Sequence, residues 1–340
     1  MNDPAANISI GRGTSTGVEA AAAPTFSASI EHAVGPLHVE SAVDPGPFLE
    51  LAAMCPLGVF DSGVGGLSIV EELRRELPAE DITYYADTAN CPYGVKTDRF
   101  LRERSLQIAG FLLEQGAKAI VVACNTASAA GLEHLRAAYS VPIVGLVPAV
   151  KPAVAASRSR IVGVLATQGT NRGRLLSDVI DRFAAPAGVE VVTSAPGELV
   201  AAVEAGAIDT PETEEAVRRA VAPMVEQGAD VLVLGCTHYP FLKEVIRRVA
   251  GDGVLIVDSG QGVSRQTRRV LQGRRLLRSE HEGVLTVFTS GNPEQVGPVV
   301  RRLTRSEVEV TYSPGEPTCL GVEQFMPGLA PSTSAVGVDR

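Results

Sequence analysis

Short apolar runs alternate with amphipathic stretches along residues 57–312 of this chain. The runs are rich in Val, Ile and Leu, as is typical of strands that helices cover on both faces. One amphipathic stretch follows Thr210, begins with Pro211 and ends at Gly228, which predicts a helix with an N-cap and a first-turn proline. The alternation predicts an α/β fold built on parallel sheets. The nine expected strands are residues 57–60, 82–86, 119–123, 142–146, 161–166, 189–193, 231–235, 254–257 and 285–288.

The chain also contains an internal repeat. The segment EQGAKAIVVACNT returns 112 positions later as EQGADVLVLGCTH, and in each copy the strand run ends at a cysteine, Cys124 or Cys236. A further pair, GVFDSGVGG at 58–66 and GVLATQGTN at 163–171, extends the similarity. We therefore predict two pseudo-symmetric α/β lobes. Each would place one cysteine at the C-terminal end of a strand, where open α/β sheets bind ligands, so that the active site lies in the cleft between the lobes.

The two ends of the chain differ from its centre. Residues 1–56 are rich in Ala, Gly, Pro and Ser and lack sustained periodicity, which predicts a disordered extension, with Met54 as an alternative start. Residues 313–340 return to Gly, Pro and Ser and predict a disordered tail.

Composition argues against several classes of function. The chain has 340 residues and a formal net charge of −9, which argues against a nucleic-acid binder, because that class needs a basic face. We find no apolar run of roughly 20 residues to cross a membrane and no secretory signal. Five cysteines without dense spacing suit reduced thiols, and we expect a cytoplasmic protein.

The paired cysteines allow several interpretations. Each could be a small buried hydrophobe, and a disulfide would be unusual in a reducing compartment. A zinc site of Cys91, Cys124, Cys236 and His238 would lack the close ligand pairs of structural zinc sites, so we predict no metal. Inversion at a carbon does need two equivalent groups, one to remove a proton and one to return it on the opposite face. Cysteine suits both roles because its reference pKa is near 8.5.

Five motifs together resemble one family. FDSGVGGLSIV, YYADTANCPYG, VVACNTASA, VPIVGLVPAVKPA and LGCTHYP occur in the order found in cofactor-independent glutamate racemases, and the resemblance runs from about Gly58 to Val300. It implies racemisation of L- and D-glutamate without pyridoxal phosphate or metal, supplying D-glutamate for peptidoglycan. It also implies that lobe one comprises residues 57–148 plus 259–312, and lobe two residues 149–258.

The resemblance assigns the site residues. Cys124 and Cys236 would be the two bases, acting on D- and L-glutamate respectively, with Asp61, His238 and Glu204 assisting. The segment around Glu204 departs from the family, because Ala195 and Pro196 stand where Cys-Pro is common and the spacing is one residue longer. Backbone amides after a strand can hold a carboxylate, which suits the DSGVGG turn. The predicted substrate-binding residues are Asp61, Ser62, Tyr93, Gly94, Asn125, Thr126, Thr237 and His238.

Two other functions remain open. An aspartate racemase would share the two cysteines, since the side-chain pocket is not readable from sequence. A non-catalytic two-lobed binding module would share the architecture, but it gives no reason for matched cysteines. The expected partner is the small molecule glutamate, without nucleic acid, membrane or cofactor. The oligomeric state is left open, with a homodimer as one option.

Overall fold

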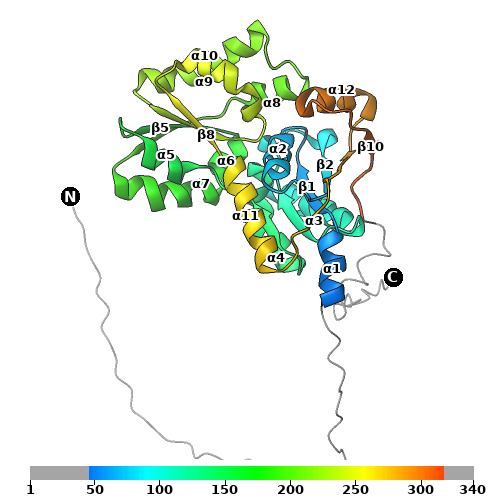
Figure 1. Cartoon of the computed structure of the whole chain (residues 1–340). Coiled ribbons are helices and arrows are strands. Elements are labelled where there is room, and N and C mark those ends of the chain that lie inside the picture. Colours follow the sequence, from blue (N-terminus) through cyan, green and yellow to red (C-terminus); the bar gives the residue numbers. More distant parts are fainter. Residues whose placement is uncertain (1–45, 318–340) are drawn as a thin grey trace, which may run out of the picture. The chain divides into compact units, whose positions relative to one another are not determined.

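The computed structural model describes residues 46–317, and the rest of the two predicted disordered ends lies outside the described residues. Within the described residues, ten strands form two sheets, in the orders β10-β9-β2-β1-β3-β4 and β6-β5-β7-β8. Every strand pair is parallel. We call the six-stranded sheet with its helices lobe one and the four-stranded sheet with its helices lobe two (Figure 1).

The strands are β1 (Leu57–Asp61), β2 (Ile82–Ala86), β3 (Ala119–Val122), β4 (Ile143–Gly145), β5 (Ile161–Ala166), β6 (Glu190–Ser194), β7 (Val231–Gly235), β8 (Leu255–Asp258), β9 (Leu285–Thr289) and β10 (Val310–Tyr312). The α-helices are α1 (Gly46–Met54), α2 (Leu67–Glu76), α3 (Asp98–Glu114), α4 (Asn125–Ala138), α5 (Val150–Ala156), α6 (Gln168–Arg172), α7 (Arg174–Val179), α8 (Gly197–Glu204), α9 (Pro211–Glu226), α10 (Lys243–Ala250), α11 (Gly260–Gly273) and α12 (Pro293–Thr304). Short helical segments are η1 (Thr88–Asn90), η2 (Tyr93–Val95), η3 (Ile180–Ala184), η4 (Ala185–Ala187) and η5 (Tyr239–Leu242).

The nine expected strands are confirmed, each within one residue at either end. The predicted helix after Thr210 is confirmed as α9, whose Thr213 amide donates to the Thr210 side chain. The order β2-β1-β3-β4 in lobe one matches β6-β5-β7-β8 in lobe two, so the internal repeat corresponds to a repeated sheet. Strand β10 was missed because it has only three residues, two of them exposed.

The hydrophobic core joins the lobes. One cluster of buried side chains includes Leu57 and Val59 of β1, Leu199 of α8, and Leu232 and Leu234 of β7. A second cluster packs α3 and α4 against lobe one, and a third packs α5 and α7 against lobe two. In Figure 1, α9 and α10 lie on one side of the lobe-two sheet and α5 and α7 on the other. Covered faces of this kind explain the continuous apolar strands.

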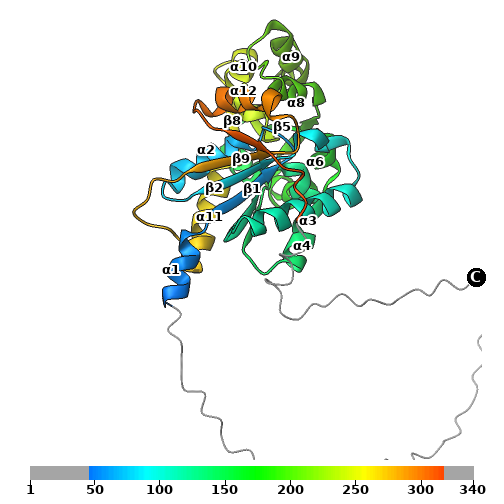
Figure 2. The same cartoon turned by 90° about the vertical axis from the view of Figure 1, so that its right-hand side faces the viewer.

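The structure extends further toward both ends than the sequence predicts. Helix α1 lies within the segment expected to be disordered, at the end of lobe one that points away from lobe two (Figure 2). Buried Lys118 pairs with Glu80 at 2.5 Å and donates to the carbonyl of Ala53 in α1 at 2.6 Å. At the other end, the Tyr85 hydroxyl donates to the carbonyl of Ser313 at 2.8 Å. These tertiary contacts, which local composition does not encode, hold the two segments in place. The predicted boundaries between the lobes stay a prediction.

No helix among residues 46–317 is both long and apolar enough to span a membrane.

Candidate active site

The predicted site residues gather where the central strands of both sheets end. Asp61 is the last residue of β1, Cys124 follows β3 by two positions, and Cys236 directly follows β7. Because β1 pairs with β3 in parallel, their carboxyl ends lie side by side. The strand ends of lobe two meet those of lobe one, since Thr237 Oγ1 donates to Asp61 Oδ2 across the lobes at 3.1 Å. The site therefore lies between the lobes.

Cys124 has an acidic neighbour. Its sulfur caps α4 and accepts from the amide of Ala127 at 3.5 Å, and the residue is only 4% exposed. Burial, followed by the negative charge of Asp61, raises the pKa of the Cys124 thiol well above its usual value. Burial also raises the pKa of the Asp61 carboxyl, although the charge of His238 and hydrogen bonds with Cys124 and Ser62 partly offset it. Asp61 and Cys124 can thus share a proton.

Cys236 has a histidine neighbour instead. Its sulfur lies 3.7 Å from Nδ1 of His238, and the opposite ring nitrogen, Nε2, lies 2.6 Å from Oε1 of Glu204. The same Glu204 oxygen accepts from the amide of Val64 at 2.8 Å. Burial opposes a charged ring, but hydrogen bonds with Cys236, Cys91 and Glu204 raise the pKa of His238 well above its usual value. These contacts therefore favour the charged form of the ring.

The two thiols share one environment. Cys236 is 5% exposed, and it lies close enough to Cys124 that the two sulfurs interact electrostatically. Two glycines allow this approach, since a Cβ at Gly65 would collide with the His238 ring and a Cβ at Gly63 would collide with the Glu204 carboxylate. The DSGVGG turn thus packs against residues of the other lobe.

Neutral hydrogen-bonding groups surround the thiols. Asn125 and Thr126 are the first residues of α4, and both are buried. Nδ2 of Asn125 is a buried donor without a partner among residues 46–317, which is costly unless a ligand accepts from it. The Thr126 hydroxyl lies 2.8 Å from that of Thr167 across the lobes. Thr167 was not predicted, although the repeat aligns it with Ser62.

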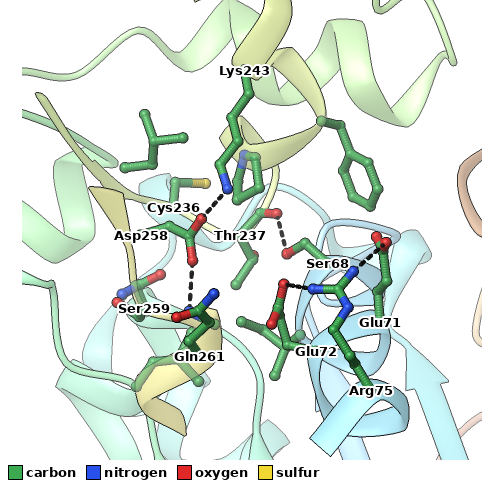
Figure 3. A pocket seen from close by; sticks show the side chains of 17 residues that line it. Ser68, Glu71, Glu72, Arg75, Cys236, Thr237, Lys243, Asp258, Ser259 and Gln261 are labelled. Carbon is green, nitrogen blue, oxygen red and sulfur yellow. Dashed lines mark hydrogen bonds and ion pairs between the residues drawn. The ribbon is translucent and has the colours of Figure 1, made fainter. Parts of the chain in front are cut away.

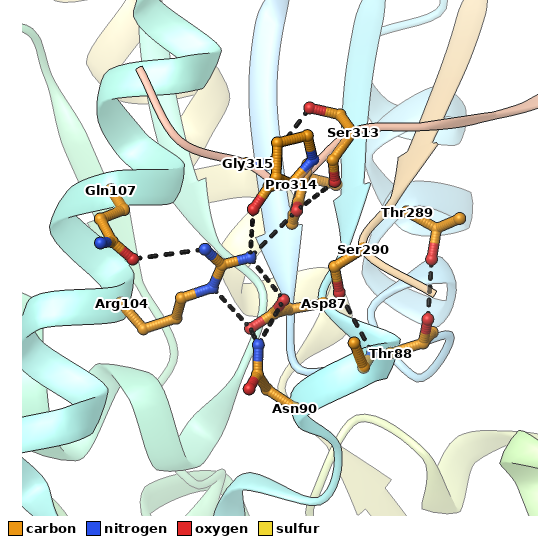
Figure 4. A network of polar contacts seen from close by, with 12 residues as sticks. Asp87, Thr88, Asn90, Arg104, Gln107, Thr289, Ser290, Ser313, Pro314 and Gly315 are labelled. Carbon is orange, nitrogen blue, oxygen red and sulfur yellow. Dashed lines mark hydrogen bonds and ion pairs between the residues drawn. The ribbon is translucent and has the colours of Figure 1, made fainter. Parts of the chain in front are cut away.

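The predicted substrate-binding residues Tyr93 and Gly94 lie in η2, which we call the substrate loop, and this segment rests on a buried ion pair. Tyr93 is buried in η2, and its hydroxyl donates to Oδ2 of Asp87 at 2.5 Å. Arg104 of α3 binds both Asp87 oxygens, at 2.7 and 3.0 Å, and also donates to the carbonyl of Pro314 at 2.8 Å (Figure 4). Burial opposes the charged carboxylate, but Arg104 and Tyr93 hold the pKa of Asp87 below its usual value. Sequence analysis missed both Asp87 and Arg104.

A cavity of about 410 Å³ reaches the site from one side (Figure 3). It is lined by Asn125, Cys236 and Thr237 but not by Cys124. Lys243 of α10 and Asp258 form an ion pair at its wall. The cavity thus touches one thiol only. With both cysteines buried and hydrogen bonds joining the lobes, a substrate between the thiols requires the lobes to separate.

One group of side chains near the thiols could hold a metal ion. Ligand atoms of Cys91, Glu204 and His238 lie within 4.8 Å of one another. Burial raises the pKa of the Cys91 thiol to about 11, so this thiol is a weak acid and keeps its proton at neutral pH.

Comparison with known proteins places the chain in a family. Residues 58–266 match the sequence model of the family described as Asp/Glu/Hydantoin racemase. The chain belongs to this racemase family. As a member it is an isomerase that acts as an amino-acid racemase. The resemblance drawn from the motifs is thereby confirmed, and so is the two-lobed α/β fold expected from the apolar runs and the internal repeat.

This chain aligns with most of the length of curated relatives that are named glutamate racemase. The glutamate racemase of Deinococcus radiodurans is 48% identical over 284 residues, which cover 83% of this chain and 97% of the relative. That of Pseudomonas aeruginosa is 48% identical over 241 residues, covering 71% and 90%. The crystal structure of Escherichia coli glutamate racemase with L-glutamate and the activator UDP-MurNAc-ala matches with a TM-score of 0.67 at 34% identity, covering 76% of this racemase and 98% of that chain.

Proposed function

We propose that this racemase interconverts L- and D-glutamate without a cofactor, using Cys124 and Cys236 as two bases on opposite faces of the α-carbon. One observation carries the proposal: two buried thiols follow matched central strands of the two lobes, and each has its own proton partner. Glutamate as the substrate is supported by relatives of that name at 44–48% identity.

The mechanism needs only proton transfers. One sulfur, as thiolate, removes the α-proton, and the thiol on the opposite side donates a proton to the resulting carbanion, which inverts the centre. Asp61 can take up or return the proton of Cys124, and His238 that of Cys236. In the reverse reaction the two sulfurs exchange roles. Hence each group serves as an acid in one direction and as a base in the other.

The carbanion needs fixed donors and a dry site. Nδ2 of Asn125 has no partner in the described part of the chain, and it lies beside the amides at the start of α4. These donors suit the substrate carboxylate, where negative charge spreads during proton removal. Ser62, Thr126 and Thr237 offer hydroxyls nearby, and Tyr93 and Gly94 would close the site from the substrate loop. Closure excludes water and strengthens each of these interactions. Only interactions that strengthen in the transition state raise the rate.

The family resemblance suggests the direction of each base and the biological role. Cys124 would act on D-glutamate and Cys236 on L-glutamate. The D-glutamate formed would supply peptidoglycan synthesis in the cytoplasm.

Isotope exchange separates the two bases. Racemisation has an equilibrium constant of one, so the two directions must show equal kcat/KM in any variant, and rates alone assign nothing. In heavy water, Cys124→Ala should slowly incorporate deuterium into L-glutamate only, because Cys236 still reaches that proton. Cys236→Ala should label D-glutamate only. Cys55→Ala is the matched control, since its sulfur donates to the Leu51 carbonyl in α1, and it should racemise and label both enantiomers.

Labelling of the same enantiomer by both variants would contradict the two-base assignment. Offering aspartate in the same assay tests the substrate, because faster turnover of aspartate than of glutamate would replace the proposal with an aspartate racemase.

A further inference from the structure

Among the cysteines that the structure describes, Cys91 is the one near the candidate site to which the proposed mechanism gives no role. It precedes the substrate loop, between β2 and α3 of lobe one. Its sulfur, a ring nitrogen of His238 and a carboxylate oxygen of Glu204 all lie within 4.8 Å of one another. The last two residues belong to lobe two, from the loop after β7 and the end of α8. Three ligand-type atoms from three separate elements therefore converge on one point.

This set matches the preferences of a thiophilic divalent cation. Thiolate, imidazole and carboxylate are the three ligand types of protein zinc sites, with bonds of about 2.3, 2.0–2.1 and 2.0–2.2 Å. Ligand atoms on one tetrahedral zinc ion therefore lie about 3.5 Å apart. The observed spread of up to 4.8 Å needs side-chain shifts of only about 1 Å, and the 2.6 Å contact between His238 and Glu204 must lengthen.

The surroundings leave room for a ligand role. Both hydrogen bonds to Glu204 within the described residues go to Oε1, so Oε2 can turn to an ion while Oε1 keeps the Val64 amide. Nε2 of His238 faces Glu204, whereas Nδ1 faces Cys236. The set thus differs from the four-residue zinc site considered from sequence, since neither Cys124 nor Cys236 belongs to it.

We propose that Cys91, Glu204 and His238 form a site for Zn²⁺, and that occupancy inhibits racemisation reversibly. The inhibition rests on the proposed function, because His238 would no longer exchange a proton with Cys236. The ion would also tie Cys91 of lobe one to two residues of lobe two, which opposes the opening that a substrate needs. Binding releases the proton of the Cys91 thiol, and that of the His238 ring when it is protonated, to the buffer. No electron is transferred.

Direct metal binding tests the site on the intact chain. Co²⁺ serves as a coloured substitute, since a coordinated thiolate gives a charge-transfer absorption band, and Zn²⁺ affinity is measured by competition with a chromophoric chelator. We expect one ion per chain, a band that Cys91→Ser and Cys91→Ala abolish, and a Zn²⁺ affinity at least about tenfold weaker in both. Cys55→Ser is the matched control and should keep the band and the affinity. Glu204→Gln should keep the band but weaken Zn²⁺ binding.

Racemase assays with and without Zn²⁺ then test whether occupancy of the site inhibits the reaction. Zn²⁺ should inhibit the parent chain and EDTA should restore it, while Cys91→Ser racemises in metal-free buffer and resists Zn²⁺. An unchanged band and affinity in both Cys91 variants would overturn the site, as would the absence of stoichiometric binding. Because the absorption band is recorded without glutamate, the metal site and the racemase function are tested independently of each other. Binding without any racemisation rejects the proposed function, and racemisation without binding rejects the metal site.

Discussion

Replacing Arg104 with Met should destabilise the protein by about 3–5 kcal/mol. The side chains of Arg104 and Asp87 are 8% and 0% exposed, and the guanidinium binds both carboxylate oxygens. Removing one partner of such a pair leaves a buried charge uncompensated, which costs about 3–5 kcal/mol. The free energy of unfolding of a typical protein is only about 5–15 kcal/mol, so this loss is a large part of it. The substitution also removes the donor to the Pro314 carbonyl.

Urea unfolding measures this loss as a lower midpoint concentration of urea, while the dependence of the unfolding free energy on urea concentration stays the same. Arg99→Met is the matched control on the same helix, because Arg99 pairs with Glu103 at 2.8 Å while the two side chains are 87% and 60% exposed. An exposed pair contributes at most about 0.5 kcal/mol. The double variant Asp87→Asn with Arg104→Met should recover much of the lost stability, since no buried charge remains.

The substrate loop supplies a second readout. Tyr93 loses its fixed partner when Asp87 moves, so the KM for glutamate should rise in Arg104→Met and stay unchanged in Arg99→Met. Equal destabilisation by the two single variants, or a double variant less stable than Arg104→Met, would refute the reasoning.

Two further predictions concern the pH dependence of protein stability and the position of the His238 ring beside Cys236. Burial opposes the charge of Asp230, but three donors of the turn before β5, at 2.6 to 2.9 Å, lower the pKa of this carboxyl to about 2. The carboxylate therefore contributes its full stabilisation above the unfolded pKa of about 3.9, and this stabilisation is lost as the pH falls through about 2. Asp230→Asn should lower the free energy of unfolding by about 1 kcal/mol at pH 7, and by progressively less from pH 4 to pH 2. Gly65→Ala should displace the His238 ring and lower kcat at least about tenfold, roughly 1.4 kcal/mol, without unfolding the protein.

Matched variants sharpen both tests. Asp252→Asn changes an exposed carboxyl and should alter stability by less than about 0.5 kcal/mol at every pH, as urea midpoints will show. A cost of Asp230→Asn that persists at pH 2 would contradict the linkage argument. Gly262→Ala adds a methyl group in open space within α11 and should leave kcat unchanged. Full activity of Gly65→Ala would mean that the position of the ring is unimportant.

Features that depend on local pattern were predictable from the sequence. The strands follow from continuous apolar runs, and the two lobes follow from the repeat around Cys124 and Cys236. Pairings between distant segments were not predictable in this way. The contact between Thr126 and Thr167 depends on how the lobes meet, although the repeat alignment marks Thr167 as equivalent to Ser62.

Arg104 shows a different limit. Three arginines occur within the first turns of α3, and nothing in their chemistry distinguishes the buried one. Helical spacing does carry a signal, because Arg104 lies three residues after Leu101 and four before Ile108, on the apolar face. Its partner Asp87 directly follows β2, and only the folded chain brings the two together.

The sheet of lobe one can be completed only late in synthesis, because two of its strands, β9 and β10, are made after lobe two. Strand β2 pairs with β9, so that Ile82 lies beside Leu285, 203 positions later in synthesis. Lobe two, between β5 and β8, is complete before β9 emerges. Early in synthesis β2 therefore exposes an unpaired edge, a state in which chains are prone to aggregate. Pro314, which accepts from Arg104 behind the substrate loop, is made later still. A prematurely terminated chain can thus contain both cysteines while its substrate loop lacks the last of its supports.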